Sequence, residues 1–195
     1  MSKKKRGLTF YTKEKKRNKG SSLIVIQYVG GVIFAVLLAS LVYYYFGMST
    51  WVVGSSMEPS VYEGEEVLID RFSTLIKKPS RGDVIVFYPN GNESSHLSVK
   101  RVIGLPGETI YISEGRVYIN NSLFEEDYSD IRITDSGIAS GTIKLKDDEF
   151  FVLGDNRNNS EDSRSANLGP VSKDDIYGKI WFKKKCSLSD AGFVK

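Results

Sequence analysis

The chain has 195 residues, a formal net charge of +3, one cysteine and one histidine. A single cysteine cannot form an internal disulfide, and one histidine without any cysteine–histidine ligand spacing excludes the common zinc sites. The length suits one ordinary domain with an appendage. We therefore expect a fold without covalent staples and a site that needs no metal.

The positive charge is concentrated at the N-terminus. Residues 1–20 hold nine of the 27 basic residues and one of the 24 acidic residues, so the remainder carries 18 bases and 23 acids. A folded domain that binds nucleic acid usually shows a basic face, which this mildly acidic remainder does not favour. We expect no nucleic-acid partner, and we interpret the basic tail as a topology signal.

An uncharged segment separates Lys19 from Glu58, and its apolar part runs from about Leu23 to Phe46. A helix of about 24 residues spans roughly 36 Å, which is enough to cross a bilayer with some tilt. Bases before such a helix hold the N-terminus in the cytoplasm. The pattern predicts a basic cytoplasmic tail over 1–22, a transmembrane signal-anchor over 23–47 and an extracytoplasmic domain over 48–195.

Two other interpretations of the apolar segment remain open. A cleaved signal peptide has a shorter apolar core followed by a small-x-small site. Here the segment instead exits into aromatic residues that favour the headgroup zone, namely Tyr43, Tyr44, Tyr45 and Trp51. The other alternative is a buried helix of a soluble protein, against which the length and the flanking charges both argue.

The part after residue 48 has the composition of a β-rich domain. Short runs of β-branched and aromatic residues alternate with turn-forming residues. The runs are 66–70, 83–88, 98–103, 109–112, 116–119 and 149–153. Many short strands with close turns favour an antiparallel barrel or folded sheet. Residues 127–141 are polar and irregular, and we expect them to form a surface loop or loose hairpin.

Ser56 is the candidate nucleophile. Gly54 permits an unusual backbone turn before it, and Pro59 stiffens the exit after Met57. Such a turn can present the hydroxyl and direct backbone N–H groups toward an oxyanion. A serine hydroxyl is nevertheless a poor nucleophile unless a neighbouring group takes its proton. A capped loop after the membrane helix is the alternative interpretation of this motif taken alone.

Lys100 is the candidate base, since it lies in an apolar run beside Val99 and Val102. Burial disfavours an ammonium and can lower the pKa of a lysine by several units. An ordinary strand lysine that reaches solvent is the alternative. His96 is the rival base, but a histidine base usually needs an acid to orient it, and the residues around His96 resemble a polar loop.

A dense polar run at 154–164 follows an apolar strand. Its charged side chains can form charge-assisted hydrogen bonds that pin a loop, and Ser160 could hydrogen-bond the amine of Lys100. We interpret this run as a clamp beside the site, against the alternative of a solvated surface turn. The charged members of the run that matter here are Asp155, Arg157, Asp162 and Arg164.

Together these motifs resemble type I signal peptidases, membrane-bound serine proteases, in the bacterial form with one anchor. The resemblance extends from the basic tail to about Ile180 and includes Gly54–Pro59, Arg81–Phe87, Lys100–Gly107 and Gly154–Arg164. It implies a mainly antiparallel β fold without a cofactor, acting on exported preproteins bound as extended strands and cut after Ala-x-Ala. The family often has an aromatic residue where Ser98 stands, and a smaller residue there could widen the pocket.

The resemblance also implies a role for each residue of the motifs. Ser56 would be the nucleophile and Lys100 the general base, while the Ser56 N–H and the region of Gly54 would form the oxyanion hole. Met57 and Pro59 would shape the turn. Ser160 would orient Lys100, and the remaining supporting residues would be an Asp162–Arg164 pair together with Asp155 and Arg157.

Two alternatives of other classes remain. A non-proteolytic assembly factor for pilus biogenesis could keep the fold, although such relatives lose the Ser-Lys pair. A self-cleaving repressor would use the same chemistry but would lack an anchor. The sequence specifies neither the oligomeric state nor whether the substrates are general or dedicated.

Overall fold

The computed structural model describes residues 19–126 and 131–194, and side chains from residue 23 onward. The first helix, α1, extends over Lys19–Phe46. Within it, Leu23–Phe46 is long and apolar enough to cross a membrane, with a mean hydropathy of 2.3. The chain divides after Ser40 into two units, the second of which begins at Leu41. The predicted tail over 1–22 falls largely outside the described residues.

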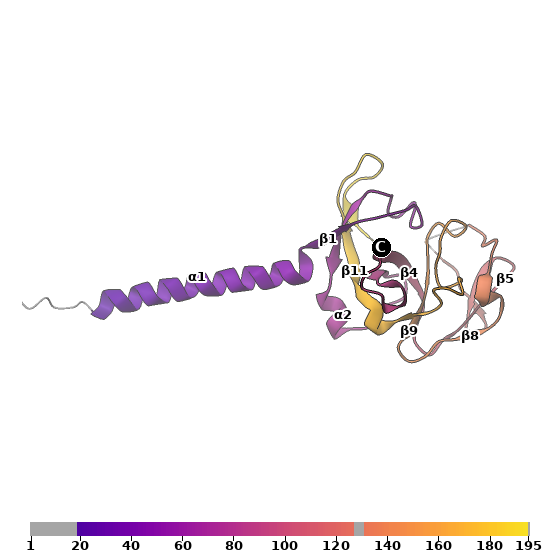
Figure 1. Ribbon diagram of the computed structural model, residues 1–195, viewed down its shortest axis with the longest axis horizontal. Coiled ribbons are helices and arrows are strands. Elements are labelled where there is room, and N and C mark those ends of the chain that lie inside the picture. Colours follow the sequence, from indigo (N-terminus) through magenta and orange to yellow (C-terminus); the bar gives the residue numbers. More distant parts are fainter. Residues whose placement is uncertain (1–18, 127–130, 195) are drawn as a thin grey trace, which may run out of the picture. The chain divides into compact units, whose positions relative to one another are not determined.

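Most strands of the second unit belong to one antiparallel sheet of eight (Figure 1). Their order is β1-β2-β11-β3-β4-β9-β10, and β12 pairs with β11. The strands of this sheet are β1 Met48–Trp51, β2 Glu66–Asp70, β3 Val84–Phe87, β4 Ser98–Gly104, β9 Glu149–Leu153, β10 Val171–Ser172, β11 Ile176–Lys183 and β12 Gly192–Phe193.

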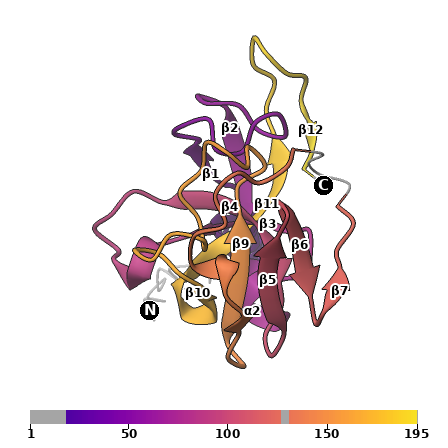
Figure 2. The ribbon, with the colours of Figure 1, turned by 90° about the vertical axis from the view of Figure 1, so that its right-hand side faces the viewer.

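A second antiparallel sheet has the order β7-β6-β5-β8, and Figure 2 shows β5, β6 and β7 in sequence beside β9. Its strands are β5 Thr109–Ser113, β6 Arg116–Ile119, β7 Ser122–Leu123 and β8 Ile143–Lys144. Short helical elements connect the strands, namely α2 Phe72–Ile76 and the 3₁₀ turns η1 Pro89–Gly91, η2 Gly137–Ser140 and η3 Lys173–Asp175. The expectation of an antiparallel folded-sheet domain after one apolar helix is confirmed.

Two burial patterns explain these strands. In β2 and β5 every second side chain is buried, as expected for a strand with one face on the core. In β3 and β9 nearly all side chains are buried, and in β4 all but Ser98. Because β3 and β4 pair with each other, the sheet has an interior region in which both faces are covered.

The segment predicted as a surface loop over 127–141 is only partly described. In the part that the structure does describe, Ile133 and Ala139 are buried in a core cluster together with Ile110 and Ile112 of β5. Residues 131–141 therefore pack against the second sheet, because two apolar side chains in this mainly polar stretch are enough to dock it.

Candidate active site

The turn around Ser56 is shaped by a glycine on one side and a buried methionine on the other. Gly54 has a φ of +83°, a left-handed conformation that favours glycine. Met57 is fully buried in an apolar cluster that includes Val61 and Val99. Ser56 is half-buried between them, and Pro59 is exposed after a cis peptide bond with Glu58. The burial of Met57 thereby fixes the position of the adjacent hydroxyl.

Lys100 lies in β4 opposite Ile85 and is 6% exposed. Its Nζ donates a hydrogen bond to Ser56 Oγ at 2.8 Å. Burial lowers the pKa of Lys100 below its ordinary value, while the negative charges of Asp162 and Glu161 oppose that shift in part. A buried amine with a lowered pKa can be neutral and can therefore accept a proton from the hydroxyl that it contacts.

The next residue along β4 has the opposite environment. Arg101 is fully buried on the other face of the strand and donates to both carboxylate oxygens of Asp155, at 2.7 Å each. It also donates to the Gly82 carbonyl oxygen and to Ser60 Oγ. Lys100, by contrast, forms no ion pair with a carboxylate in the part of the chain that the structure describes. Arg101 is therefore neutralised by an ion pair, whereas the adjacent Lys100 is buried without one.

The run 154–164 folds into a loop held by its own charges. Arg164 donates to both carboxylate oxygens of Asp162, at 2.8 Å each, and Asp162 accepts a further bond from the Gly154 N–H. Arg157 is buried and pairs with Glu126, outside the loop. These bonds agree with the expected Asp162–Arg164 pair.

The 154–164 loop is also hydrogen-bonded to the turn that carries Ser56. The Asn156 N–H donates to the Ser56 carbonyl oxygen at 3.0 Å, and Asn156 Nδ2 donates to the Ser55 carbonyl oxygen. Asn159 Nδ2 donates to Ser55 Oγ at 2.9 Å. Three hydrogen bonds therefore connect segments about a hundred residues apart in the chain, and they limit movement of the hydroxyl relative to Lys100.

Ser160 is placed differently from what the sequence indicated, whereas His96 is exposed, as the polar residues around it led us to expect. Ser160 Oγ is buried without a hydrogen-bond partner among the described residues, so the expected bond to Lys100 is absent. The lysine amine instead donates to Ser56 Oγ, and Ser160 Oγ lies against Gly154. His96 is exposed and precedes the first residue of β4, which separates it from the buried face where Lys100 lies.

Sequence reasoning missed Arg101, Glu126 and Asn159, and it counted Asn156 among the polar residues that pin the loop without foreseeing its bonds to the Ser56 turn. Arg101 could have been found from the sequence. Successive side chains of a strand point to opposite faces, so in a strand that is apolar on both faces Lys100 and Arg101 are each buried on a different face. Asn159 and Glu126 had no such signal. Their partners are distant in the chain, and only the folded structure brings them together.

Gly154 lies where the clamp meets the nucleophile turn, and it supports a first prediction. A Cβ at this position would come within 2.5 Å of the Ser56 carbonyl oxygen and would overlap Ser160 Oγ. We expect Gly154→Ala to displace Ser56 and to lower the rate of acyl transfer by roughly 100-fold, the effect typical of a 1 Å misplacement. Gly141→Ala is the matched control, since its Cβ would meet nothing closer than 3.8 Å. Equal rates for the two variants would contradict the clamp.

A serine hydroxyl on a turn, hydrogen-bonded to a desolvated lysine of an antiparallel sheet, is the arrangement of a candidate Ser-Lys hydrolase. Comparison with known families agrees with this class. The family described as "Signal peptidase, peptidase S26" matches residues 25–183. The chain therefore belongs to the S26 family of signal peptidases.

Individual relatives are similar over most of their length. Signal peptidase I P of Bacillus subtilis subsp. natto is 34% identical over 85% of this chain and 90% of the relative. Signal peptidase I T of Bacillus subtilis strain 168 is 33% identical over 88% and 91%. A crystal structure of a signal peptidase I from Enterococcus faecalis is 33% identical, with a TM-score of 0.43, and covers 53% of this chain and 97% of that one.

Proposed function

We propose that this protein is a type I signal peptidase, a membrane-bound serine endopeptidase that removes N-terminal signal peptides from exported preproteins. The observation that carries the proposal is the 2.8 Å hydrogen bond from Lys100 Nζ to Ser56 Oγ, in a chain of the S26 family. Cleavage follows small-x-small sites such as Ala-x-Ala. The preprotein binds as an extended strand, which supplies main-chain hydrogen bonds.

The reaction has two acyl-transfer steps. Neutral Lys100 takes the proton of the Ser56 hydroxyl as Oγ attacks the scissile carbonyl carbon. The tetrahedral intermediate then collapses, the C–N bond breaks, and the Lys100 ammonium returns the proton to the leaving amine. In the second step Lys100 takes a proton from water, and the hydroxide attacks the ester. Collapse of that intermediate regenerates Ser56 and frees the signal peptide carboxylate.

The oxyanion of both intermediates is stabilised by backbone. The Ser56 N–H has no hydrogen-bond partner among the described residues, so it is available to donate to a substrate oxygen. The left-handed turn at Gly54 orients this donor, and the clamp keeps it in place before substrate arrives. Such preorganised donors stabilise the transition state without reorganisation. Asp155, Arg157, Asp162 and Arg164 support the site through ion pairs that do not touch the reacting atoms. Ser160, by contrast, forms no hydrogen bond among the described residues.

The anchor places this chemistry at the cell membrane. The apolar helix Leu23–Phe46 crosses the bilayer once, with the basic N-terminal tail in the cytoplasm and the β-rich domain outside. Signal peptides carry an apolar segment of their own and partition into the same bilayer. Confining enzyme and substrate to one surface raises their effective concentration.

The test is cleavage of a preprotein by the detergent-solubilised full chain. We expect wild type to release the signal peptide at an Ala-x-Ala site and to leave intact a matched preprotein with leucine at the position before the cut. N-terminal sequencing of the product identifies the bond. A folded preparation that cuts none of several preproteins would instead favour the non-proteolytic assembly factor, for which no observation speaks at present.

The lowered pKa of Lys100 predicts the direction in which kcat/KM changes with pH. Only the neutral amine accepts a proton, so kcat/KM should fall as pH decreases through the pKa of Lys100. Because the charge of Glu161 raises that pKa, Glu161→Gln should move the acidic limb to lower pH. Glu114→Gln is the control, since Glu114 is exposed and is not among the charges that act on Lys100. A limb that moves to higher pH, or that moves equally in both variants, would rule out this assignment.

A further inference from the structure

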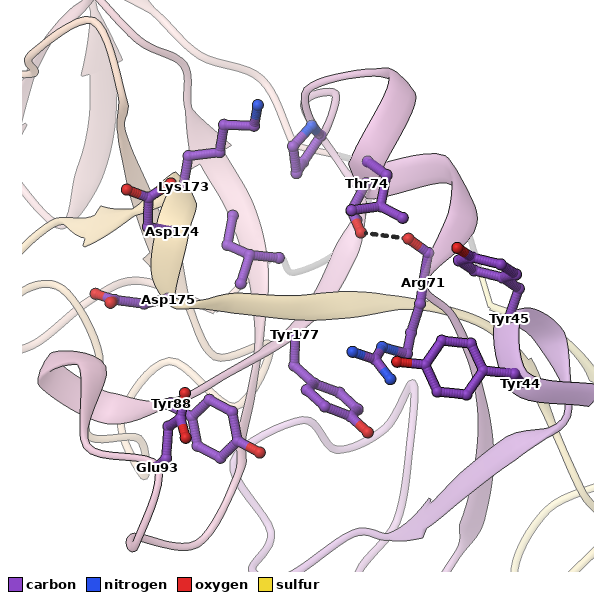
Figure 3. Close-up of a pocket in the computed structure, with 13 residues that line it drawn as sticks. Tyr44, Tyr45, Arg71, Thr74, Tyr88, Glu93, Lys173, Asp174, Asp175 and Tyr177 are labelled. Carbon is purple, nitrogen blue, oxygen red and sulfur yellow. Dashed lines mark hydrogen bonds between the residues drawn. The ribbon is translucent and has the colours of Figure 1, made fainter. Parts of the chain in front are cut away.

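A second cavity lies beside the last turn of α1, away from Ser56 and Lys100. Its volume is about 640 Å³, and its lining includes Tyr44 and Tyr45 of α1, Arg71, Tyr177 and the 3₁₀ turn η3. Figure 3 shows the side chains of Arg71, Tyr177 and the acidic residues of η3 gathered around this space. The catalytic assignment uses none of these residues.

Arg71 brings a positive charge to one side of the cavity. Its guanidinium stacks on the rings of Tyr44 and Tyr177, at 5.0 and 4.5 Å from their centroids, and donates to Met48 Sδ. No carboxylate pairs with it in the described part of the chain. Aromatic faces hold the guanidinium in place but leave its charge unneutralised, so Arg71 can still bind an anion.

The opposite side of the cavity carries an excess of acidic groups. Three carboxylates, of Glu93, Asp174 and Asp175, line it together with one cation, Lys173, and Figure 3 shows the three acids across the Tyr177 ring from Arg71. Burial, together with the charge of Asp174, raises the pKa of Asp175, which indicates that its charge is poorly solvated. An entirely anionic ligand would meet repulsion at these carboxylates, and an entirely cationic ligand would meet it at Arg71. A ligand that carries one negative and one positive charge a few bonds apart can place the negative charge at Arg71 and the positive charge at the carboxylates.

The position of the cavity along the chain points to the membrane surface. Tyr44 and Tyr45 are among the last residues of the apolar span Leu23–Phe46, at the level where headgroups lie if that span crosses a bilayer. The adjacent helix α2 exposes Leu75 and Ile76, which are 66% and 72% exposed. Apolar side chains beside a charged cavity offer a surface for acyl chains next to a site for a headgroup.

We propose that this cavity binds the headgroup of a zwitterionic phospholipid, with the phosphate against Arg71 and the ammonium toward Glu93, Asp174 and Asp175. This assignment rests on the membrane anchoring that is part of the proposed function. Bound lipid would then contact both the end of the anchor and the loop that follows β2.

Native mass spectrometry of the full chain in lipid-free detergent tests the proposal. We expect wild type to retain one phosphatidylethanolamine and to retain phosphatidylglycerol more weakly. Arg71→Gln removes the charge-assisted bonds to phosphate, so its retention of phosphatidylethanolamine should fall roughly tenfold. Lys77→Gln, an exposed cation just after α2 and outside the cavity, should behave as wild type.

A second variant keeps the test decisive if Arg71→Gln fails to fold. Asp174→Asn/Asp175→Asn should weaken binding of phosphatidylethanolamine but not of phosphatidylglycerol. Soluble glycerophosphoethanolamine, which lacks acyl chains, should leave no retained adduct. The proposal would be overturned by unchanged retention in the folded variants, by equal retention of the two lipids, or by a soluble adduct as stable as that of the lipid.

The lipid site and the peptidase assignment can fail separately. Ser56→Ala should lose preprotein cleavage and still retain phosphatidylethanolamine, because Ser56 does not line the cavity. If wild type retains phosphatidylethanolamine but cleaves no preprotein, the lipid site is supported and the peptidase assignment is rejected. If it cleaves a preprotein but retains no lipid selectively, the peptidase assignment is supported and the lipid site is rejected.

Discussion

Ser56→Ala should reduce preprotein cleavage by roughly 10⁴- to 10⁶-fold, the range found when the nucleophile of a serine protease is removed. Lys100→Met should cause a comparable loss, since methionine fills the buried space but accepts no proton. The double variant should be no worse than either single variant, because hydroxyl and amine act as one unit. Single-turnover cleavage of a labelled preprotein measures all three.

Controls separate chemistry from folding in this series. Removing a buried amine removes its desolvation cost, so Lys100→Met should melt at or above the temperature of wild type. His96→Ala changes an exposed side chain outside β4 and should cleave at the wild-type rate. Substantial cleavage by folded Lys100→Met, or its loss in His96→Ala, would show that a different base serves Ser56.

Asp155→Ala should be the most damaging substitution for stability. It leaves the Arg101 guanidinium buried without its carboxylate, and breaking a buried ion pair in this way costs roughly 3–5 kcal/mol. For a domain of this size that corresponds to a fall in melting temperature of roughly 10 °C or more. Thermal unfolding followed by tryptophan fluorescence provides the measurement.

Two further variants test whether the loss of stability in Asp155→Ala comes from the unpaired charge of Arg101 and not from the smaller side chain. Asp190→Ala removes the acid of an exposed pair with Lys185, where solvent screens the attraction, and should leave the melting temperature nearly unchanged. Arg101→Met/Asp155→Ala removes both buried charges and should be more stable than Asp155→Ala alone. If the double variant is the less stable of the two, the uncompensated charge is not the cause.

The strands of β2, β6 and β9 could be predicted to the residue, because alternation or a short apolar run bounded by turns marks each of them. The eight-residue strand β11 was missed, although it lies between β2 and β3 in the large sheet. Two lysines, a glycine and mixed burial obscure its period, and its pairing with two distant strands decides its conformation. The short helix α2 was missed for a similar reason, since five residues carry no helical period.

By itself, the sequence determined the apolar span and the antiparallel class of the fold, because periodicity and charge distribution are properties of neighbouring residues. It offered Ser56 and Lys100 as candidates, and the family resemblance joined them as a pair. Only the tertiary structure decided that Asp155 neutralises Arg101 rather than Lys100, that Asn156 and Asn159 hold the nucleophile turn, and that Ser160 does not reach the amine. These outcomes depend on which side chains share a buried space. Desolvation and hydrogen-bond geometry act over a few ångströms in space, whatever the separation along the chain.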